Sequence, residues 1–279
     1  MSILMTPAYQ AATAYPLLHA RIGWENLARL ATIAASSTNT GESYLQAPIS
    51  DQTFEWWQAI RLPATWAATF STPQVVNYCG IAAHEIGSAG ATVQVQTQNG
   101  GVWTDVTDAA LTPTDDSAIM ILFENITCDA ARIRITGAGG PPRIGIIHFG
   151  YVLEMARPVK WMGHTPTRFQ RDFDKRPNNS DRGQRLGSSV VRQGLSGSFS
   201  VANLDESWVR STFDLFIVNS IRYGYFISWR PDQFPDEVYF GWTDKPIVPT
   251  NSRGGVTRYM SVGWDMDCHD PENVEAWES

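Results

Sequence analysis

One hairpin signal constrains the fold of this chain more than any other feature. Small or apolar residues alternate with polar ones through Ala91–Gln98, and the turn sequence Asn99–Gly101 separates this run from a second one, Val102–Val106. An Asn-Gly turn between two alternating runs is a strong β-hairpin signal. Because side chains alternate between the faces of a strand, Val93 and Val95 are expected to face a core.

Further strands are predicted on both sides of this hairpin. They are short, rich in β-branched and aromatic residues, and bounded by Gly, Pro, Asn and Asp. The predicted strands are Trp66–Phe70, Val75–Ala83, Ser117–Phe123, Ala131–Thr136 and Ile144–Leu153. Strands with this spacing and punctuation indicate a β-sandwich or jelly roll, and argue against a parallel α/β sheet.

The middle of the chain is polar and lacks a strand pattern. The stretch Arg157–Gly187 contains several Pro and Asn residues, and it is expected to be a domain connection or a long arm. Its densest basic part, Arg168–Arg192, is interrupted by Asp172, Asp174 and Asp181. This mixed charge predicts a solvated loop.

A second β-rich block begins near Leu186 and contains one helix. The helix is predicted over residues 205–221, with Asn203 as the N-cap and Glu206 completing a capping box. A strand is expected before the helix and three after it: Ser196–Val201, Tyr223–Trp229, Glu237–Trp242 and Thr257–Asp267. The tail from His269 is polar and expected to be loose.

Composition excludes several classes of protein. With 43% hydrophobic and 18% charged residues, the 279-residue chain can bury the core of two ordinary domains. A net charge of −7 without a Lys/Arg run is unlike a nucleic-acid binder. The start of the chain has no signal-peptide pattern, and no apolar run reaches the roughly eighteen residues of a membrane span. Three cysteines far apart argue for folding in a reducing cytoplasm.

An ordered set of motifs between residues 20 and 153 resembles the discoidin, or coagulation factor 5/8 type C, family. The set comprises Ala34-Ala35-Ser36-Ser37, Phe54-Glu55-Trp56-Trp57, Ala64–Phe70, Val75–Ile81, Val93–Val106 and Ala131-Arg132-Ile133-Arg134-Ile135. The resemblance implies a galactose-binding-like jelly-roll sandwich. Within it, Ile133 and Ile135 are expected to face the core, with Arg132 and Arg134 outward.

The whole chain also resembles bacteriophage tail proteins in which a discoidin-like domain is joined to a tail-type domain. The residues that carry this likeness are Tyr15–Leu17, His19–Ile22, Gly163–Pro166, Arg192–Gly194, Phe226–Pro231, Pro235–Val238 and Gly241–Trp242. The strand–helix–strand order of the second block resembles the sandwich-plus-helix unit of tail-tube and distal tail proteins. That resemblance implies ring assembly around a tail axis through edge strands and arms.

The expected fold is mainly β, with an N-terminal discoidin-like jelly-roll sandwich and a C-terminal β-sandwich that carries one packed helix. The expected order is an N-terminal segment, the jelly roll, a connecting arm, the tail-assembly domain and a loose tail. Their boundaries are 1–22, 23–155, 156–187, 188–270 and 271–279.

No recognised catalytic or phosphate-binding motif is present. The chain lacks Gly-x-Ser-x-Gly, His-Glu-x-x-His, P-loop and Cys-x-x-Cys sequences, so neither an enzyme nor a bound cofactor is expected. A glycosidase would need two carboxylates across a cleft. The sequence contains Glu55, Asp232, Asp236 and Glu237, but it does not show which of them would face each other. Asp265, Asp267 and His269 could share one side of a strand near an ion, but a solvated strand end is the preferred interpretation, and no metal site is assigned.

The primary hypothesis is a structural component of a phage tail tip or baseplate, located in the virion and in the host cytoplasm during assembly. Its expected partners are other tail proteins, further copies in a homo-oligomeric ring, and host-surface glycan, without nucleic acid. Assembly candidates are Arg168, Phe169, Phe173, Trp229 and Trp242, and carbohydrate-binding candidates near the loops Ser37–Gln46 and His84–Gly90 are Trp24, Tyr44, Trp56 and His84. Trp57 is expected in the core. The alternatives are a free-standing carbohydrate-binding lectin and, last, a polysaccharide hydrolase.

Overall fold

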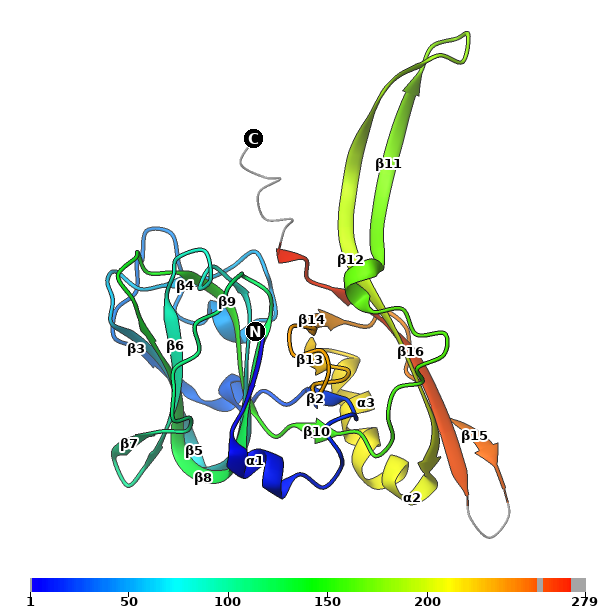
Figure 1. Ribbon diagram of the computed structural model, residues 1–279. Helices are drawn as coiled ribbons and strands as arrows, with labels where there is room; N and C mark the ends of the chain where they lie inside the picture. The colour runs from blue at the N-terminus through cyan, green and yellow to red at the C-terminus, as the bar shows by residue number, and fades with distance from the viewer. Residues whose placement is uncertain (1, 255–257, 272–279) are drawn as a thin grey trace.

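The chain forms two β-rich domains that pack against each other. The computed structural model describes residues 2–254 and 258–271 (Figure 1). The strands there belong to two hydrogen-bonded networks of eight strands each. This confirms the prediction of a mainly β fold in which a jelly-roll sandwich is combined with one packed helix.

The first network is the jelly-roll domain. Its strands are β1 (Ile3–Met5), β3 (Thr32–Ala35), β4 (Trp57–Gln58), β5 (Ala64–His84), β6 (Thr92–Asn99), β7 (Val102–Asp105), β8 (Ile119–Thr136) and β9 (Arg143–Gly150). A short helix, α1 (Pro7–Ala12), follows β1, and two 3-10 turns, η1 (Leu27–Leu30) and η2 (Ala47–Ile49), lie before β3 and before β4. The pairing of β6 with β7 confirms the Asn-Gly hairpin.

Two long strands, β5 and β8, pair with each other and pass from one sheet of the sandwich to the other. Their register shifts between Thr69 and Gln74. On one side of this break they join β3, β6 and β7 in what we call the front sheet. On the other side they join β1, β4 and β9 in the back sheet. The sequence had indicated two separate strands within each of these long ones.

The two sheets differ in burial, and the sequence pattern follows the difference. In the front sheet Ile133 and Ile135 are buried and Arg134 is exposed, as the alternation predicts. In the back sheet every residue of Val76–Ala82 and of Ile144–Gly150 is buried. A continuous buried run is expected of a strand covered on both faces, and here the second domain covers the outer face.

The second network is one sheet in the order β10-β2-β13-β14-β16-β12-β11, with β15 paired to β16. Its strands are β2 (Arg21–Gly23), β10 (Leu153–Glu154), β11 (Arg171–Asn179), β12 (Arg185–Asp205), β13 (Tyr225–Ser228), β14 (Val238–Trp242), β15 (Thr250–Arg253) and β16 (Tyr259–Cys268). A 3-10 turn, η3 (Thr167–Phe169), precedes β11. The helix runs from α2 (Glu206–Trp208) through the π turn η4 (Val209–Phe213) to α3 (Asp214–Ser220).

This sheet is covered by the helix on one face and by the jelly roll on the other. Tyr225 packs edge-on against Phe216 of the helix, with ring centroids 4.9 Å apart. The next residue, Phe226, lies in a different cluster with Phe240 and with Tyr78 of the back sheet. Successive residues of β13 therefore pack against opposite layers, and Phe226 is on the side that contacts the jelly roll.

The jelly roll is inserted into the second domain. β2 and β10 are antiparallel neighbours, with Ile22 opposite Leu153, and β2 also pairs with β13. The chain leaves the second sheet after β2, builds all of the sandwich except β1 and returns at β10. The sequence had indicated a simple succession of domains, because these two short strands carry no pattern that reveals their pairing.

The N-terminal residues, whose position the sequence left open, connect the domains. β1 runs parallel to β8 in the back sheet. The backbone amide of Ile3 donates to Pro235 O of the second domain at 3.0 Å. In addition, Arg21 Nε of β2 donates to the Tyr9 hydroxyl of α1 at 2.8 Å.

Two sequence predictions about the second domain are corrected. The helix is capped by Asp205, whose side chain accepts from Ser207 N at 2.9 Å, whereas Asn203 lies within β12 with a φ of 58°. The stretch Arg168–Arg192, predicted as a loop, contains a two-stranded hairpin of β11 and the start of β12. Its alternation was not visible because neither face meets a core. The tail beyond Pro271 lies outside the described residues.

Candidate functional site

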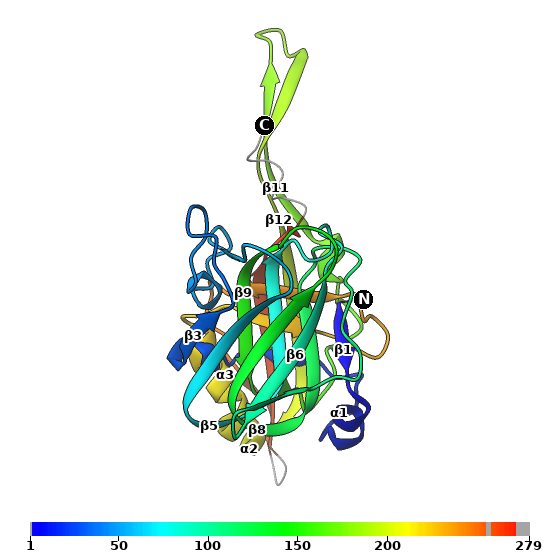
Figure 2. The same cartoon turned by 90° about the vertical axis from the view of Figure 1, so that its left-hand side faces the viewer.

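The hairpin of residues 171–194, which we call the arm, projects away from both domains (Figures 1 and 2). All nine residues of β11 are exposed, and so is every residue from 181 to 190. Ser180, in the turn, is partly buried. The turn is closed by Ser180 N donating to Gln184 O at 2.8 Å, and Gly183 there has a φ of 78°. The pairing with β12 continues into the second sheet, which fixes the direction of the arm.

Three of the predicted assembly residues lie at the base of the arm. Phe169 and Phe173 are exposed large apolar side chains. The Arg168 guanidinium lies 5.2 Å from the Phe169 ring centroid and 4.0 Å from a carboxylate oxygen of Glu237. The base of the arm thus combines apolar and basic groups on an open surface.

The other two predicted assembly residues lie elsewhere. Trp229 is only 2% exposed, and its Nε1 donates to Glu237 Oε2 at 2.6 Å, so it belongs to the core of the second domain. This corrects its assignment to an interface. Trp242 lies at the end of β14 and is partly exposed. An aromatic residue in a strand does not reveal from sequence alone which face it occupies.

Sequence reasoning missed four exposed apolar residues in and near the arm. Leu186 and Val190 lie on β12, and Trp161 and Met162 lie on the segment before η3. Met162 is 91% exposed, and the Trp161 ring stacks on Phe234 with centroids 6.3 Å apart. Isolated apolar residues in a polar stretch were the signal that could have identified them.

Two of the predicted carbohydrate-binding residues are brought together at one end of the jelly roll. Tyr44 N donates to Trp56 O at 3.0 Å, and Tyr44 is 66% exposed. Phe54, which sequence reasoning did not select, is 70% exposed two residues before Trp56. These three aromatic residues form what we call the loop-end surface.

Polar groups lie beside Trp56. The Arg143 guanidinium is 4.6 Å from its ring centroid and 3.7 Å from a carboxylate oxygen of Glu85. The Trp56 Nε1 is buried without a hydrogen-bond partner among the described residues. An aromatic ring with neighbouring Arg and Glu side chains has the groups that stack on a sugar ring and bond its hydroxyls.

The other two predicted carbohydrate-binding residues are not available at this surface. Trp24 packs against the core of the second domain. His84 is buried, its Nε2 lies 3.0 Å from Ser117 O, and its Nδ1 accepts from Ile86 N. Both residues therefore have structural contacts. Trp57 is fully buried, as predicted.

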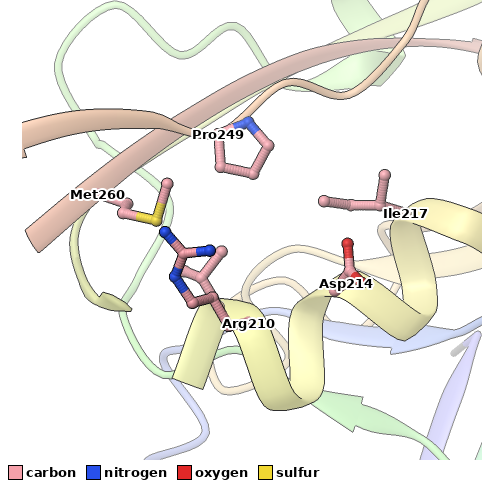
Figure 3. Close-up of a pocket in the computed structure, with 6 residues that line it drawn as sticks. Arg210, Asp214, Ile217, Pro249 and Met260 are labelled. Carbon is pink, nitrogen blue, oxygen red and sulfur yellow. The ribbon is translucent and has the colours of Figure 1, made fainter. Parts of the chain in front are cut away.

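A hollow of about 290 Å³ lies between the helix and the β15–β16 pair (Figure 3). Its lining combines apolar side chains with one basic and one acidic group, from Val209, Arg210, Asp214, Ile217, Pro249 and Met260. Arg210 is already paired with Glu206 at 2.8 Å. The hollow lies at the end of the second domain away from the arm.

Asp265, Asp267 and His269 do not form a metal site. Across residues 2–254 and 258–271 no group of three or more His, Cys, Asp or Glu side chains is placed to hold an ion. Asp265 instead lies 3.7 Å from Lys245 Nζ, and the backbone amide of His269 donates to Phe240 O at 2.8 Å. In the part of the chain that is described, none of the helices is long and apolar enough to span a bilayer.

No family model matches the chain, and neither does any curated protein. Solved structures match less than half of the chain, at low similarity. Chitosan-binding module 1 of a Paenibacillus sp. IK-5 chitosanase/glucanase is 20% identical, covers 45% of this chain and 98% of its own, and has a TM-score of 0.40. A family 32 carbohydrate-binding module of C. perfringens NanJ, in complex with galactose, is 14% identical, covers 48% and 99%, and has a TM-score of 0.40. A Ruminococcus gnavus GH29 fucosidase is 17% identical, with 46% of this chain and 27% of the enzyme covered and a TM-score of 0.40. The chain is similar to these structures over a part of its length. The identities and TM-scores are too low to assign their ligands to this chain.

Proposed function

We propose that the chain is a structural subunit of a bacteriophage tail tip or baseplate, and that it assembles with its neighbours through the arm. The observation that carries this proposal is the exposure of every residue of β11. A two-stranded hairpin without a third strand or a core is at best marginally stable in water. A long one is therefore expected to be stabilised by a partner.

The side chains of the arm are suited to a protein partner. Phe173, Leu186 and Val190 are exposed apolar residues in a part of the chain whose residues are mostly polar. β11 is also the terminal strand in the order of its sheet, and a terminal strand is where a strand of another chain can be added. Apolar side chains beside such a strand favour docking onto another subunit over permanent exposure to water.

Charge favours a contact between the arm and the body of another copy. Residues 168–192 contain seven basic and three acidic side chains, whereas the whole chain has a net charge of −7. Opposite charges steer such surfaces together. An arm that docks on a different part of the next subunit makes a head-to-tail contact, which closes into a ring when the rotation between subunits allows it.

The tail assignment itself rests on the sequence resemblance described above and stays a prediction. Under it, the second domain and the arm build the ring. The jelly roll lies outside the ring, where it braces neighbouring tail proteins or meets host-surface glycan. The protein is then located in the virion, and in the host cytoplasm during assembly.

Shortening the arm tests the assembly function. Residues 174–192 are replaced by Asn-Gly, which joins Phe173 to Gln193, two residues already opposite each other. Light scattering after size-exclusion chromatography is expected to show multi-subunit assemblies for the natural chain and monomers for the shortened one. The thermal unfolding of both should agree, because the arm contributes nothing to either core.

A matched pair of single substitutions separates docking from general surface effects. Leu186 on the arm and Val102 on the β6–β7 hairpin are almost equally exposed, at 65% and 66%. Leu186→Ser is expected to weaken assembly, and Val102→Ser to leave it unchanged. A natural chain that stays monomeric at every concentration and is absent from purified tail particles would show that the proposal is wrong.

A second candidate function is carbohydrate binding at the loop-end surface. The observation that favours it is the cluster of Tyr44, Phe54 and Trp56 beside Arg143 and Glu85. Aromatic rings offer apolar faces to sugars, and the paired Arg and Glu offer a donor and an acceptor for hydroxyl groups. Chitosan and galactose, which are named for two of the similar structures, are the first ligands to test.

Binding to a glycan array, compared between the natural chain and Tyr44→Ala or Trp56→Ala, tests this second function. Trp103→Ala is the matched control, because Trp103 is also half-buried beneath an arginine, with Arg132 4.0 Å from its centroid. Loss of binding in the first two variants alone supports the surface. Glycan binding by a strictly monomeric protein would favour the free-standing lectin, and turnover of a polysaccharide would favour the hydrolase.

A further inference from the structure

The contact between the domains has a charged centre at Asp51. This residue lies in the jelly roll between η2 and β4, and its side chain is mostly buried. Its Oδ2 accepts from the backbone amide of Gly224 in the second domain at 2.9 Å and from Arg29 Nη2 at 2.5 Å. Its Oδ1 lies 3.0 Å from His148 Nε2. One carboxylate thus joins three groups from two domains.

Arg29 adds another contact between the two domains at this centre. While one guanidinium nitrogen bonds Asp51, the guanidinium carbon lies 3.8 Å from the ring centroid of Tyr223, just before Gly224. The guanidinium of the jelly roll is therefore held between its own carboxylate and an aromatic ring of the second domain. A cation over an aromatic face is attracted by the negative face of the ring, so this contact adds to the attraction between the domains.

His148 occupies the apolar side of the same centre. It is fully buried, and its ring meets Phe226 and Phe240 of the second sheet edge-on, with centroids 5.1 and 5.7 Å apart. Its Nδ1 is buried without a hydrogen-bond partner among the described residues. A neutral ring with its proton on Nε2 fits this environment, because it donates to Asp51 and places no N–H among the phenyl rings.

A second proton on His148 does not fit. It would sit on Nδ1, which has no acceptor beside it, and would place a full charge between two phenyl rings. Burial lowers the pKa of His148, and the positive charge of Arg29 adds to this, while Asp51 acts in the opposite direction. Asp51 and Arg29 are the charged groups of the described residues that act on His148, and the neighbouring Tyr78 of β5 stays neutral because burial raises its pKa.

We propose that Asp51 and His148 form an acid-released latch. This pair fixes the jelly roll against the second domain, which carries the arm, at neutral pH and releases it when His148 is protonated. The chain crosses between the domains before β2, after β2 and before β10, and no strand is shared between the two sheets, so the rest of the contact can separate without breaking either sheet. Release would free the jelly roll to turn relative to the arm.

The direction of the pH effect follows from linkage. In a separated state His148 is hydrated, with a pKa near 6.5. Its pKa in the latched state is lower, so the separated state binds more protons, and latching weakens as pH falls below about 6.5. Burial raises the pKa of Asp51, but His148, Arg29 and the Gly224 amide together hold it below its usual value. Protonation of Asp51 therefore weakens the latch further at still lower pH.

The test must distinguish release from unfolding, because burial also lowers the pKa of His19, His84, His164 and His269. Small-angle X-ray scattering of the chromatographically isolated monomer measures domain separation, and far-UV circular dichroism measures unfolding. Between about pH 7.5 and pH 5 we expect the radius of gyration to rise while the dichroism stays constant.

Two variants assign the effect to the latch. His148→Gln keeps an amide donor toward Asp51 but cannot titrate, so its radius of gyration should stay at the neutral value in acid. His164→Gln is the matched control, since His164 is another histidine of lowered pKa, which packs against Trp229 within the second domain. This control should expand like the natural chain.

A further variant keeps the proposal testable if His148→Gln fails to fold. Asp51→Asn removes the charge that holds Arg29 and His148, and it should be expanded already at neutral pH. The proposal is overturned if the natural chain keeps its radius of gyration down to the pH at which its dichroism is lost. Expansion that is the same in natural chain and His148→Gln would also overturn it.

Discussion

The backbone of Gly80 in the back sheet lies directly against the ring of Phe226 in the second domain. A Cβ built on Gly80 would come within 2.6 Å of that ring. This approach allows the jelly roll and the second sheet to share one apolar cluster. The contact between the domains therefore depends on the absence of a side chain at Gly80.

Substitution of Gly80 by Ala is expected to destabilise the protein by about 1–3 kcal/mol, the usual cost of overpacking. Phe226 cannot move aside, because it also packs against His148 and Phe240. Urea unfolding measures the loss. Gly187→Ala is the control, since a Cβ on this arm residue meets nothing within 4 Å. Equal stabilities of the two variants would contradict this account of the contact.

Substitution of Asp205 by Ala is expected to lower the free energy of unfolding by about 1 kcal/mol, because it removes the N-cap of the helix. Asn203→Gly should be neutral or stabilising, because Asn203 has a φ of 58°, which glycine adopts without strain. Thermal unfolding distinguishes the two positions. If Asn203 were the cap, as the sequence had indicated, the larger loss would be expected at that residue.

Acid is expected to destabilise the fold through His84. Burial, the largest cause, lowers its pKa to about 4, although Asp116 and the Ser117 carbonyl act in the opposite direction. The unfolded chain has a histidine pKa near 6.5, so it binds the proton first, and stability falls between about pH 6.5 and pH 4. Urea unfolding across this range should show a shallower pH dependence for His84→Gln. Identical slopes for variant and natural chain would exclude His84 as a source of the effect.

The three cysteines are expected to be unreactive in the native protein. All are free and buried. Burial raises the pKa of Cys128 to about 11 and the pKa values of Cys79 and Cys268 further, so little reactive thiolate forms near pH 8. A colorimetric thiol assay should report almost no reaction in buffer and three equivalents per chain in urea. Rapid labelling of the folded protein would show that a core opens readily.

Local sequence patterns predicted those parts of the fold that depend on neighbouring residues. The Asn99-Gly100 turn and the alternation around it gave the β6–β7 hairpin, because turn chemistry and pleat operate over a few residues. The alternation of Arg132–Ile135 likewise predicted which side chains are buried. Of the aromatic residues of the loop-end surface, Tyr44 and Trp56 were predicted and Phe54 was not, since the sequence does not show whether an aromatic side chain is exposed or buried.

Long-range arrangements could not be predicted in this way. The insertion of the jelly roll depends on the pairing of Ile22 with Leu153, and strands of two or three residues carry no periodic signal. The arm was predicted as a loop because a strand exposed on both faces has no apolar alternation. Asp51 had no sequence signal at all, since its role depends on groups 22, 97 and 173 residues away.

The pairing of β2 with β10 makes the jelly roll a replaceable cassette. The chain departs from the second sheet and rejoins it at neighbouring strands, so the two ends of the inserted segment lie close together. A different compact domain could take its place provided that it offers a flat apolar face to Phe226 and Phe240 and a strand for β1 to pair with. The same arm-bearing framework could thus carry different outer modules while its own assembly contacts stay constant.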